Sequence, residues 1–349
     1  MGHRLIKIVA AGALALALQP LRPSLTAAAS PCQVEGVERI VAVGDVHGAF
    51  DRFVEILQTA GIVDERLRWA GGGTYFIQTG DVLDRGPDSL KVLDLLRRLE
   101  EEAPRAGGAS FLLLGNHEVM RLLGDLRYAA PGEYQAFVTP KSERNRREYM
   151  RSRNGTDRDQ PLEATPLGLF EMRVAFGREG PYGAWLRKLN AVVKINGMLF
   201  LHGGISPAFA GTSCDAINAT LRREITTDID KTRTSPRQSL SARSDGPLWY
   251  RGLAQEPDGF APVVADILAR QHARAMVIGH TVSSSGRIHD RFDGRVFQID
   301  TGMQQEYQPG GRASALEIRD GVFTAIYQDR RDVILPGAVD ETAVIPIRR

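Results

Sequence analysis

The stretch that decides the fold is Arg39-Ile-Val-Ala-Val43, which runs directly into Gly44-Asp-Val-His-Gly48. A short β-branched run bounded by glycine is typical of a buried strand, so this pattern places Asp45 and His47 just beyond a strand end. Four more apolar runs end in the same way. They are Thr74–Gln78 before Gly80-Asp-Val-Leu-Asp-Arg-Gly86, Phe111–Leu114 before Gly115-Asn-His-Glu118, Met198–Leu201 before His202-Gly-Gly204, and Ala275–Ile278 before Gly279-His-Thr281.

Helical patterns lie between the early strands. Phe50–Ala60 and Ser89–Leu99 both carry apolar residues at one-face spacing, which is typical of amphipathic helices. The alternation of strand and helix predicts an α/β protein, in which polar residues beyond the strand ends can converge on one place. Three later runs resemble hairpins that complete a second sheet. These are Val296–Ile299, Ala315–Ile318 and Val322–Tyr327.

The composition is that of a globular protein. Of the 349 residues, 43% are hydrophobic and 25% are charged, and the net charge is +2. This balance argues against a disordered chain and gives no reason to expect a nucleic-acid partner. We expect one domain over residues 30–349, with a mostly helical insert at about 120–189. The basic segment Lys141–Arg153 in that insert is a solvated helical face or a lid that offers cations to an anionic substrate.

The first residues follow the order of a secretory signal peptide. Arg4 and Lys7 precede the apolar run Ile8–Leu18, and small residues follow at 27–29. The run is short for a membrane span, which needs roughly 20 residues, although an uncleaved anchor is the rival interpretation. We therefore predict a signal peptide over residues 1–29. The mature protein would be periplasmic or extracellular, with no stable membrane insertion after cleavage.

Export bears on the two cysteines, Cys32 and Cys214. An oxidising compartment permits a disulfide between them, which would tie the mature N-terminus to the domain. The alternative is two unpaired thiols. A zinc site built on cysteine is not expected from two such distant residues.

The polar residues at the strand ends form a coherent set of metal ligands. The set, in chain order, is Asp45, His47, Asp81, Asn116, His202 and His280. A mixture of carboxylate, imidazole and amide oxygen suits two divalent ions such as Mn, Fe or Zn. One carboxylate can bridge two cations about 3.5–4 Å apart, and such a pair makes a shared water nucleophilic near neutral pH.

The order of these motifs resembles the metal-dependent phosphoprotein phosphatases within the calcineurin-like metallophosphoesterases. The resemblance extends over about residues 39 to 302. It implies two mixed β-sheets packed as a central sandwich flanked by helices. The segments Leu248-Trp-Tyr-Arg-Gly252 and Ile299-Asp-Thr-Gly-Met303 resemble the bacterial-type branch called Shewanella-like phosphatases.

The resemblance also implies roles for individual residues. Asp45, His47 and Asp81 would hold one metal, and Asp81, Asn116, His202 and His280 the other, with Asp81 bridging. His117 would be the general acid, oriented by Asp84, and Arg85 would clamp the phosphoryl group. Arg251 is the candidate for a second clamp, with Arg243 and Arg287 as alternatives.

The expected reaction is hydrolysis of phosphomonoesters on phosphoserine, phosphothreonine or phosphotyrosine by a metal-bridging hydroxide. The substrate would be a phosphorylated protein or a small phosphomonoester, and we expect a monomer. One alternative is a dinucleoside polyphosphate hydrolase, because Arg85-Gly-Pro-Asp-Ser-Leu90 resembles that relative as well. Others are a broad phosphodiesterase or nucleotidase and a phosphate-recognition scaffold without activity.

Overall fold

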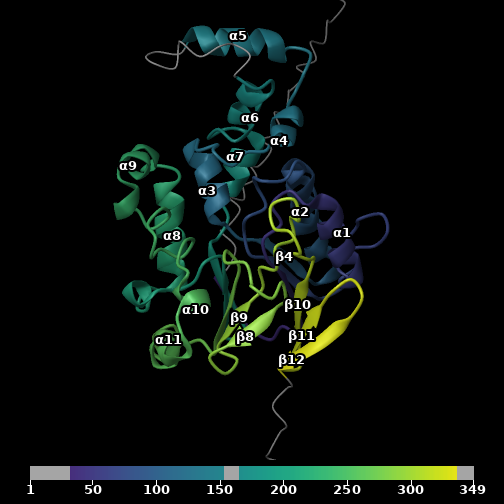
Figure 1. The fold of residues 1–349 in the computed structure, drawn as a ribbon, viewed down its shortest axis with the longest axis vertical. Coiled ribbons are helices and arrows are strands. Elements are labelled where there is room, and N and C mark those ends of the chain that lie inside the picture. The colour runs from purple at the N-terminus through teal and green to yellow at the C-terminus, as the bar shows by residue number, and fades with distance from the viewer. Residues whose placement is uncertain (1–31, 153–164, 336–349) are drawn as a thin grey trace, which may run out of the picture.

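The fold is built on two mixed, six-stranded sheets packed face to face, seen in a computed structural model that describes residues 32–152 and 165–335 (Figure 1). The first sheet has the order β12-β11-β10-β2-β3-β4 and the second β1-β5-β6-β7-β9-β8. In the first sheet the strands are β2 (Arg39–Val43), β3 (Tyr75–Gln78), β4 (Ala109–Leu112), β10 (Ala315–Arg319), β11 (Val322–Ile326) and β12 (Arg331–Leu335). In the second they are β1 (Gln33–Val34), β5 (Val192–Ile195), β6 (Met198–Leu201), β7 (Ala275–Ile278), β8 (His289–Arg291) and β9 (Val296–Gln298).

After Arg39, strand β2 is apolar at every position because both of its faces are buried. Successive side chains of a strand point to opposite faces. Ile40 and Ala42 belong to the core that joins the two sheets, whereas Val41 and Val43 pack into the core formed with the helices. Both faces are buried, so the run is continuous rather than alternating.

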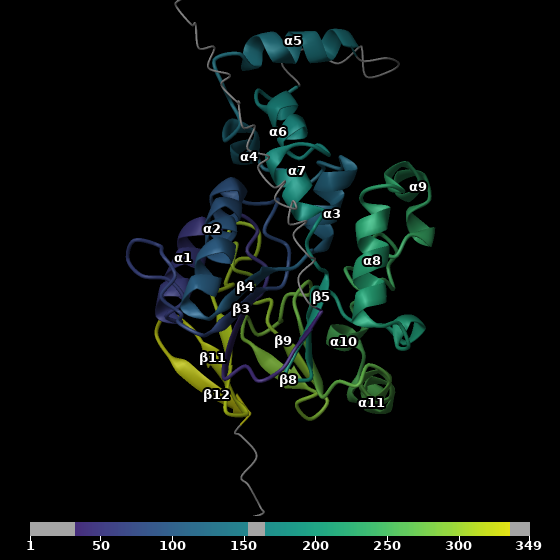
Figure 2. The same ribbon diagram turned by 180° about the vertical axis from the view of Figure 1, so that it is seen from behind.

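Helices cover the outer faces of the two sheets. Figure 2 shows α1 and α2 beside the sheet that contains β3 and β4, with α8, α10 and α11 on the side of β5. The helical segment between β4 and β5 extends away from the sheets, and α5 lies at its far end (Figure 1). The helices are α1 (Phe50–Thr59), α2 (Ser89–Glu102), α3 (Asn116–Leu123), α4 (Pro131–Gln135), α5 (Ser142–Ser152), α6 (Leu169–Ala175), α7 (Pro181–Leu186), α8 (Cys214–Glu224), α9 (Ile229–Thr234), α10 (Gly252–Gln255) and α11 (Ala261–Arg270). None of the helices in the described ranges is long and apolar enough to span a membrane.

The expected two-sheet α/β architecture is confirmed, with one difference in how the late strands are used. Strand β9 joins the second sheet as predicted, next to β7. The hairpin β10–β11 instead extends the first sheet, because β10 pairs antiparallel with β2. Apolar patterning marks both runs as buried strands but does not encode which sheet they join.

The two cysteines form a disulfide between the start of the described chain and α8. The Cα atoms of Cys32 and Cys214 are 6.1 Å apart, and the bond joins residues 182 positions apart. The backbone N–H of Lys194 donates to the Cys32 carbonyl oxygen at 2.7 Å, next to the parallel pairing of β1 with β5. The bridge therefore fastens the edge strand β1 to the second sheet. The predicted signal peptide lies outside the described residues.

Reduction of this disulfide is expected to destabilise the protein by about 2–4 kcal/mol, because the bond closes a long loop in the unfolded chain. Thermal or urea unfolding with and without dithiothreitol measures the effect. The double variant C32A/C214A is the control and should unfold at the reduced midpoint under both conditions. A wild-type midpoint that does not respond to reductant would contradict the prediction.

Candidate active site

The five strand ends identified in the sequence converge at one edge of the sandwich. Strands β2 and β3 are parallel neighbours in one sheet, and β6 and β7 are parallel neighbours in the other. Their ends carry Asp45, Asp81, His202 and His280 to the same place. The sheets approach so closely there that a Cβ on Gly44 would lie 2.6 Å from the Ile299 carbonyl oxygen. Glycine is required at that contact, which explains the residue that precedes Asp45.

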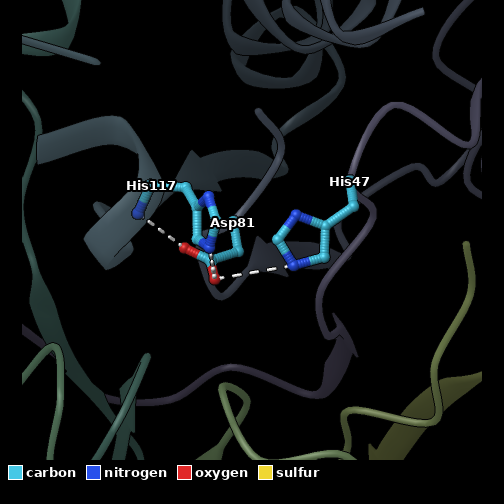
Figure 3. Close-up of side chains that lie close together, drawn as sticks. All are labelled: His47, Asp81 and His117. Atoms are coloured by element: carbon cyan, nitrogen blue, oxygen red, sulfur yellow. Dashed lines mark hydrogen bonds and ion pairs between the residues drawn. The ribbon is translucent and has the colours of Figure 1, made fainter. Parts of the chain in front are cut away.

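Asp81 lies at the centre of the buried cluster. Its Oδ2 is 3.1 Å from His202 Nε2, 3.7 Å from His47 Nε2 and 3.8 Å from His117 Nε2. Figure 3 shows the carboxylate between the rings of His47 and His117. Potential ligand atoms form two sets, each within 4.8 Å, and both sets contain Asp81: one adds His47 and His117, the other His202 and His280.

The other two predicted ligands lie beside these sets. Asp45 Oδ2 is 3.9 Å from His47 Nε2, and Asn116 Oδ1 is 3.0 Å from His202 Nε2. Asp45 Oδ1 also accepts a hydrogen bond from the backbone N–H of His280 at 3.0 Å. All six residues predicted as metal ligands are thus buried in one cluster.

Each of the three histidines predicted as metal ligands has one ring nitrogen at a backbone carbonyl oxygen. The pairs are His47 Nδ1 with Leu83 at 2.8 Å, His202 Nδ1 with Thr79 at 3.1 Å, and His280 Nε2 with Trp249 at 3.2 Å. A donated N–H at that nitrogen leaves the lone pair of the other nitrogen facing the carboxylates. This arrangement is common for metal-binding imidazoles, because it fixes both tautomer and ring orientation.

Burial sets the ionisation of these groups. It lowers the pKa of His47 to about 3, and burial together with the charge of His202 lowers that of His280 to about 2. Burial also lowers the pKa of His202, but Asp81 and Asp45 raise it to about 9. Burial and the neighbouring Asp300 raise the pKa of Asp45 well above its usual range. His47 and His280 are therefore neutral and ready to bind a cation, whereas His202 and Asp45 would give up protons when a cation replaces the positive charge of His202. Imidazole and carboxylate groups that release protons on binding are a donor set for divalent cations, so these residues fit a metal centre.

Several of the site residues have unusual backbone conformations. Positive φ angles, which are uncommon outside glycine, occur at His47 (47°), Asp81 (58°), Asp84 (69°), Arg85 (70°) and His280 (65°). Such conformations cost free energy and persist where the surrounding structure enforces them. The turns after the strands therefore aim these side chains inward.

A second chain of contacts leads away from Asp81 through His117. His117 Nδ1 is 2.7 Å from Asp84 Oδ2, and Arg121 Nη2 donates to Asp84 Oδ1 at 2.6 Å and to Glu133 Oε1 at 3.1 Å. Burial raises the pKa of Asp84, but the hydrogen bond from His117 and the charge of Arg121 bring it below the usual value. Burial lowers the pKa of His117, whereas Asp81 and Asp84 raise it above the ordinary value. The pair thus holds a proton on the imidazole and a charge on the carboxylate.

Arg85 lies beside His117 and Asp84 and has an N–H donor without a partner among the described residues. Its Nη2 is 3.4 Å from His117 Nε2, and its Cζ lies 3.7 Å from the ring centre of Tyr307 and 5.8 Å from that of Tyr128. Its buried Nε has no hydrogen-bond partner among the described residues. A guanidinium held flat by stacking, with free N–H groups, is suited to bind an oxyanion.

Comparison with known proteins agrees with this geometry. Residues 38–284 match the calcineurin-like phosphoesterase family. The chain belongs to that family. It is 31% identical to Shewanella-like protein phosphatase 2 of Arabidopsis thaliana over 82% of this chain and 76% of that protein. An uncharacterized protein of Schizosaccharomyces pombe is 32% identical, over 83% of this chain and 81% of its own length.

A crystal structure of a cold-active protein tyrosine phosphatase superposes with a TM-score of 0.71 and 26% identity, covering 88% of this chain and 81% of that one. The resemblance stated from the sequence motifs is therefore confirmed. The protein is a hydrolase of the metallophosphoesterase class, and its clusters of histidine and aspartate are those of a metal-binding phosphatase.

The candidate clamp Arg251 of this phosphoesterase lies next to His280. Its Nη1 donates to the His280 carbonyl oxygen at 2.8 Å and to Thr281 Oγ1 at 3.0 Å. Of the alternatives, Arg243 is held by an ion pair with Asp245, and the guanidinium of Arg287, exposed like that of Arg251, makes no described hydrogen bond to a predicted ligand residue. Arg251 is thus the one of the three whose guanidinium contacts a predicted ligand residue.

Sequence reasoning missed residues that hold the phosphoesterase site in shape. Glu118 accepts hydrogen bonds from the backbone N–H groups of Asp81, Val82, Leu83 and Gly115, and so fixes the turn that carries Asp81. Asp300, whose pKa burial raises to about 6, lies against Asp45. The helical spacing of His117 and Arg121, four residues apart on α3, is a signal that could have found Arg121.

Replacement of Arg121 by Met is expected to cost about 3–5 kcal/mol, because it leaves the buried carboxylates Asp84 and Glu133 without their shared cation. The control is Arg127→Met. The Arg127 side chain is 67% exposed, and the change breaks its ion pair with Asp125. That change should cost less than about 1 kcal/mol. Urea unfolding of both variants measures the difference. Equal losses would show that the buried network does not stabilise the fold.

Proposed function

We propose that this chain is a phosphoprotein phosphatase that hydrolyses phosphomonoesters on phosphoserine, phosphothreonine or phosphotyrosine. The observation that carries the proposal is the contact of His117 with Asp84 at 2.7 Å, beside both Asp81 and Arg85. A proton donor, its orienting carboxylate and an anion clamp beside a metal-binding cluster are the parts that hydrolysis of a phosphomonoester needs.

We infer that two divalent ions, Mn, Fe or Zn, occupy the cluster around Asp81. Asp45, His47 and Asp81 would hold one ion, and Asp81, Asn116, His202 and His280 the other. When bound, the ions would supply a nucleophilic water and neutralise charge on the phosphoryl oxygens. Asp81 belongs to both sets of potential ligand atoms, which supports its role as the bridge.

In the proposed reaction the residues of the chain bind the phosphoryl group and protonate the leaving oxygen. Arg85 would grip the phosphoryl oxygens with its free N–H groups, while Tyr307 keeps the guanidinium plane in place. Arg251 would be a second contact from the side of His280. His117 would donate the proton on Nε2 to the leaving oxygen, while Asp84 accepts the hydrogen bond from Nδ1 and stabilises the protonated ring.

The names of similar proteins support this substrate class. The Arabidopsis relative is named as a protein phosphatase, and the superposed structure as a protein tyrosine phosphatase. By analogy the substrate here would be a phosphorylated protein or a small phosphomonoester. We further propose a monomeric domain over residues 30–349 with a helical insert at about 120–189, exported after removal of residues 1–29. The disulfide supports export, because such bonds persist in oxidising compartments.

A substrate panel tests the proposal directly. Mature protein supplied with Mn should release phosphate from a phosphoserine or a phosphotyrosine peptide at a higher kcat/KM than it cleaves a diadenosine polyphosphate. Release of inorganic phosphate and separation of nucleotide products measure the two reactions. Cleavage of the dinucleotide alone would replace the proposed function with the rival hydrolase.

The acid role of His117 predicts a dependence on the leaving group. His117→Asn should lower kcat about 10²–10⁴-fold on a phosphoserine peptide, whose alkoxide leaving group needs a proton. The loss should be much smaller on 4-nitrophenyl phosphate, whose leaving group departs without one. His289→Asn, which lies outside the metal cluster, is the control. An equal loss on both substrates would assign His117 to binding rather than proton transfer.

A further inference from the structure

A cavity of about 260 Å³ lies between α3, α6 and α9, apart from the Asp81 cluster. Five of its twelve lining residues are arginines, and none is Asp or Glu. We call it the arginine cavity, after Arg121, Arg173, Arg178, Arg187 and Arg233. The other lining residues are glycine or apolar. The cavity therefore combines concentrated positive charge with walls that offer no other polar side chain.

Arg187 is the most unusual member because it is a buried cation without a carboxylate partner. It is 8% exposed. Its Nε donates to the Ile225 carbonyl oxygen at 3.0 Å, and its Nη1 to those of Phe176, Gly177 and Gly183. Its Nη2 makes only a long contact of 3.5 Å with the Leu122 carbonyl oxygen and is the donor most available to a ligand. No carboxylate of the described residues lies within ion-pair distance of it. Carbonyl dipoles offset part of its charge, but buried charges are normally paired with an opposite charge.

The other arginines of the cavity add to this excess. Burial, together with the positive charges of Arg178 and Arg233, lowers the pKa of Arg187, and the charge of Glu179 offsets this only in part. The carboxylates near these two are Glu179 and Asp230, whose side chains are 93% and 91% exposed. Pairs so exposed are weak, and their carboxylates face water rather than the cavity.

Arg121 differs, because Asp84 and Glu133 neutralise it from within the fold. Arg173 forms no ion pair within the described part of the chain, and its guanidinium lies 5.8 Å from the ring centre of Tyr149. Arg173 is exposed, and its guanidinium donates none of the described side-chain hydrogen bonds, so its N–H groups can reach a ligand at the mouth of the cavity. The uncompensated charge thus belongs to residues that line the cavity and not to the catalytic pair.

We propose that the arginine cavity is a second anion site that binds a phosphate group. The guanidinium fork matches phosphate oxygens, and charge-assisted hydrogen bonds of this kind are among the strongest in proteins. The space suffices for a tetrahedral oxyanion and several waters, each of which occupies about 30 Å³ in the liquid. The ligand is either free inorganic phosphate or a phosphoryl group on a bound molecule. The inference does not rest on the proposed phosphatase activity.

Calorimetric titration of the metal-loaded protein with inorganic phosphate tests the site. The variant R173Q/R178Q removes two charges from residues that are exposed and donate none of the described side-chain hydrogen bonds, so its fold should be kept. The matched control R144Q/R147Q removes two exposed arginine charges from α5. We expect wild type and control to bind two phosphates per chain, and R173Q/R178Q to bind the second at least tenfold more weakly, since each charged hydrogen bond contributes about 1.5–3 kcal/mol.

An unchanged isotherm for R173Q/R178Q, or an equal loss in R144Q/R147Q, would overturn the proposal. Free phosphate and a substrate phosphoryl group are distinguished as ligands by comparing peptides with one and two phosphoryl groups. A lower KM for the doubly phosphorylated peptide that is lost in R173Q/R178Q identifies a substrate phosphoryl group as the ligand, whereas equal KM values identify free phosphate. Because calorimetry needs no turnover, an inactive protein would refute the proposed function while leaving this site open to measurement.

Discussion

The buried carboxylate of Asp81 is the constraint on which the rest of this structure depends. Burial opposes its ionisation, but the surrounding histidines, led by His202 and His117, keep its pKa well below the usual range. Its Oδ1 accepts from the backbone N–H of His117 at 3.0 Å, and Glu118 fixes the backbone on either side. A charge placed this deep is stable only where hydrogen bonds and opposite charges surround it. The two sheets meet at this point because their strand ends supply those groups.

Much of the site follows from the sequence because its residues stand directly after apolar strands. Parallel neighbours end at the same edge of a sheet, so Asp45 and Asp81 had to be near each other once β2 and β3 paired. The same holds for His202 and His280 on β6 and β7. The short apolar runs located these strands to within about two residues. The largest shift is at β4, which begins and ends two residues before the predicted run Phe111–Leu114.

Other features depend on contacts that the linear pattern does not encode. The left-handed turns at Asp84 and Arg85 are enforced by tertiary structure, for example by the hydrogen bond from the Arg85 N–H to the Tyr128 carbonyl oxygen. Glu133 comes from α4 and Tyr307 from a loop far along the chain, so their places beside Arg121 and Arg85 could not be derived from spacing. The sequence pattern likewise does not encode which sheet β10 and β11 join.

The helical segment between β4 and β5 has a structural part in the site. Through Glu133 it holds Arg121, which in turn holds Asp84 against His117. Through α6 it also supplies Arg173 to the arginine cavity, whose wall includes the same Arg121. One buried guanidinium therefore lies between the His117–Asp84 pair and the cavity, and the packing of this segment bears on both.

We propose that the Asp81 carboxylate lies between two bound cations. Anomalous diffraction from crystals grown with Mn measures this directly, because each bound ion gives its own peak. We expect two peaks, both in contact with the Asp81 carboxylate, one near His47 and the other near His202 and His280. A single peak, or a pair of which only one touches Asp81, would contradict the account.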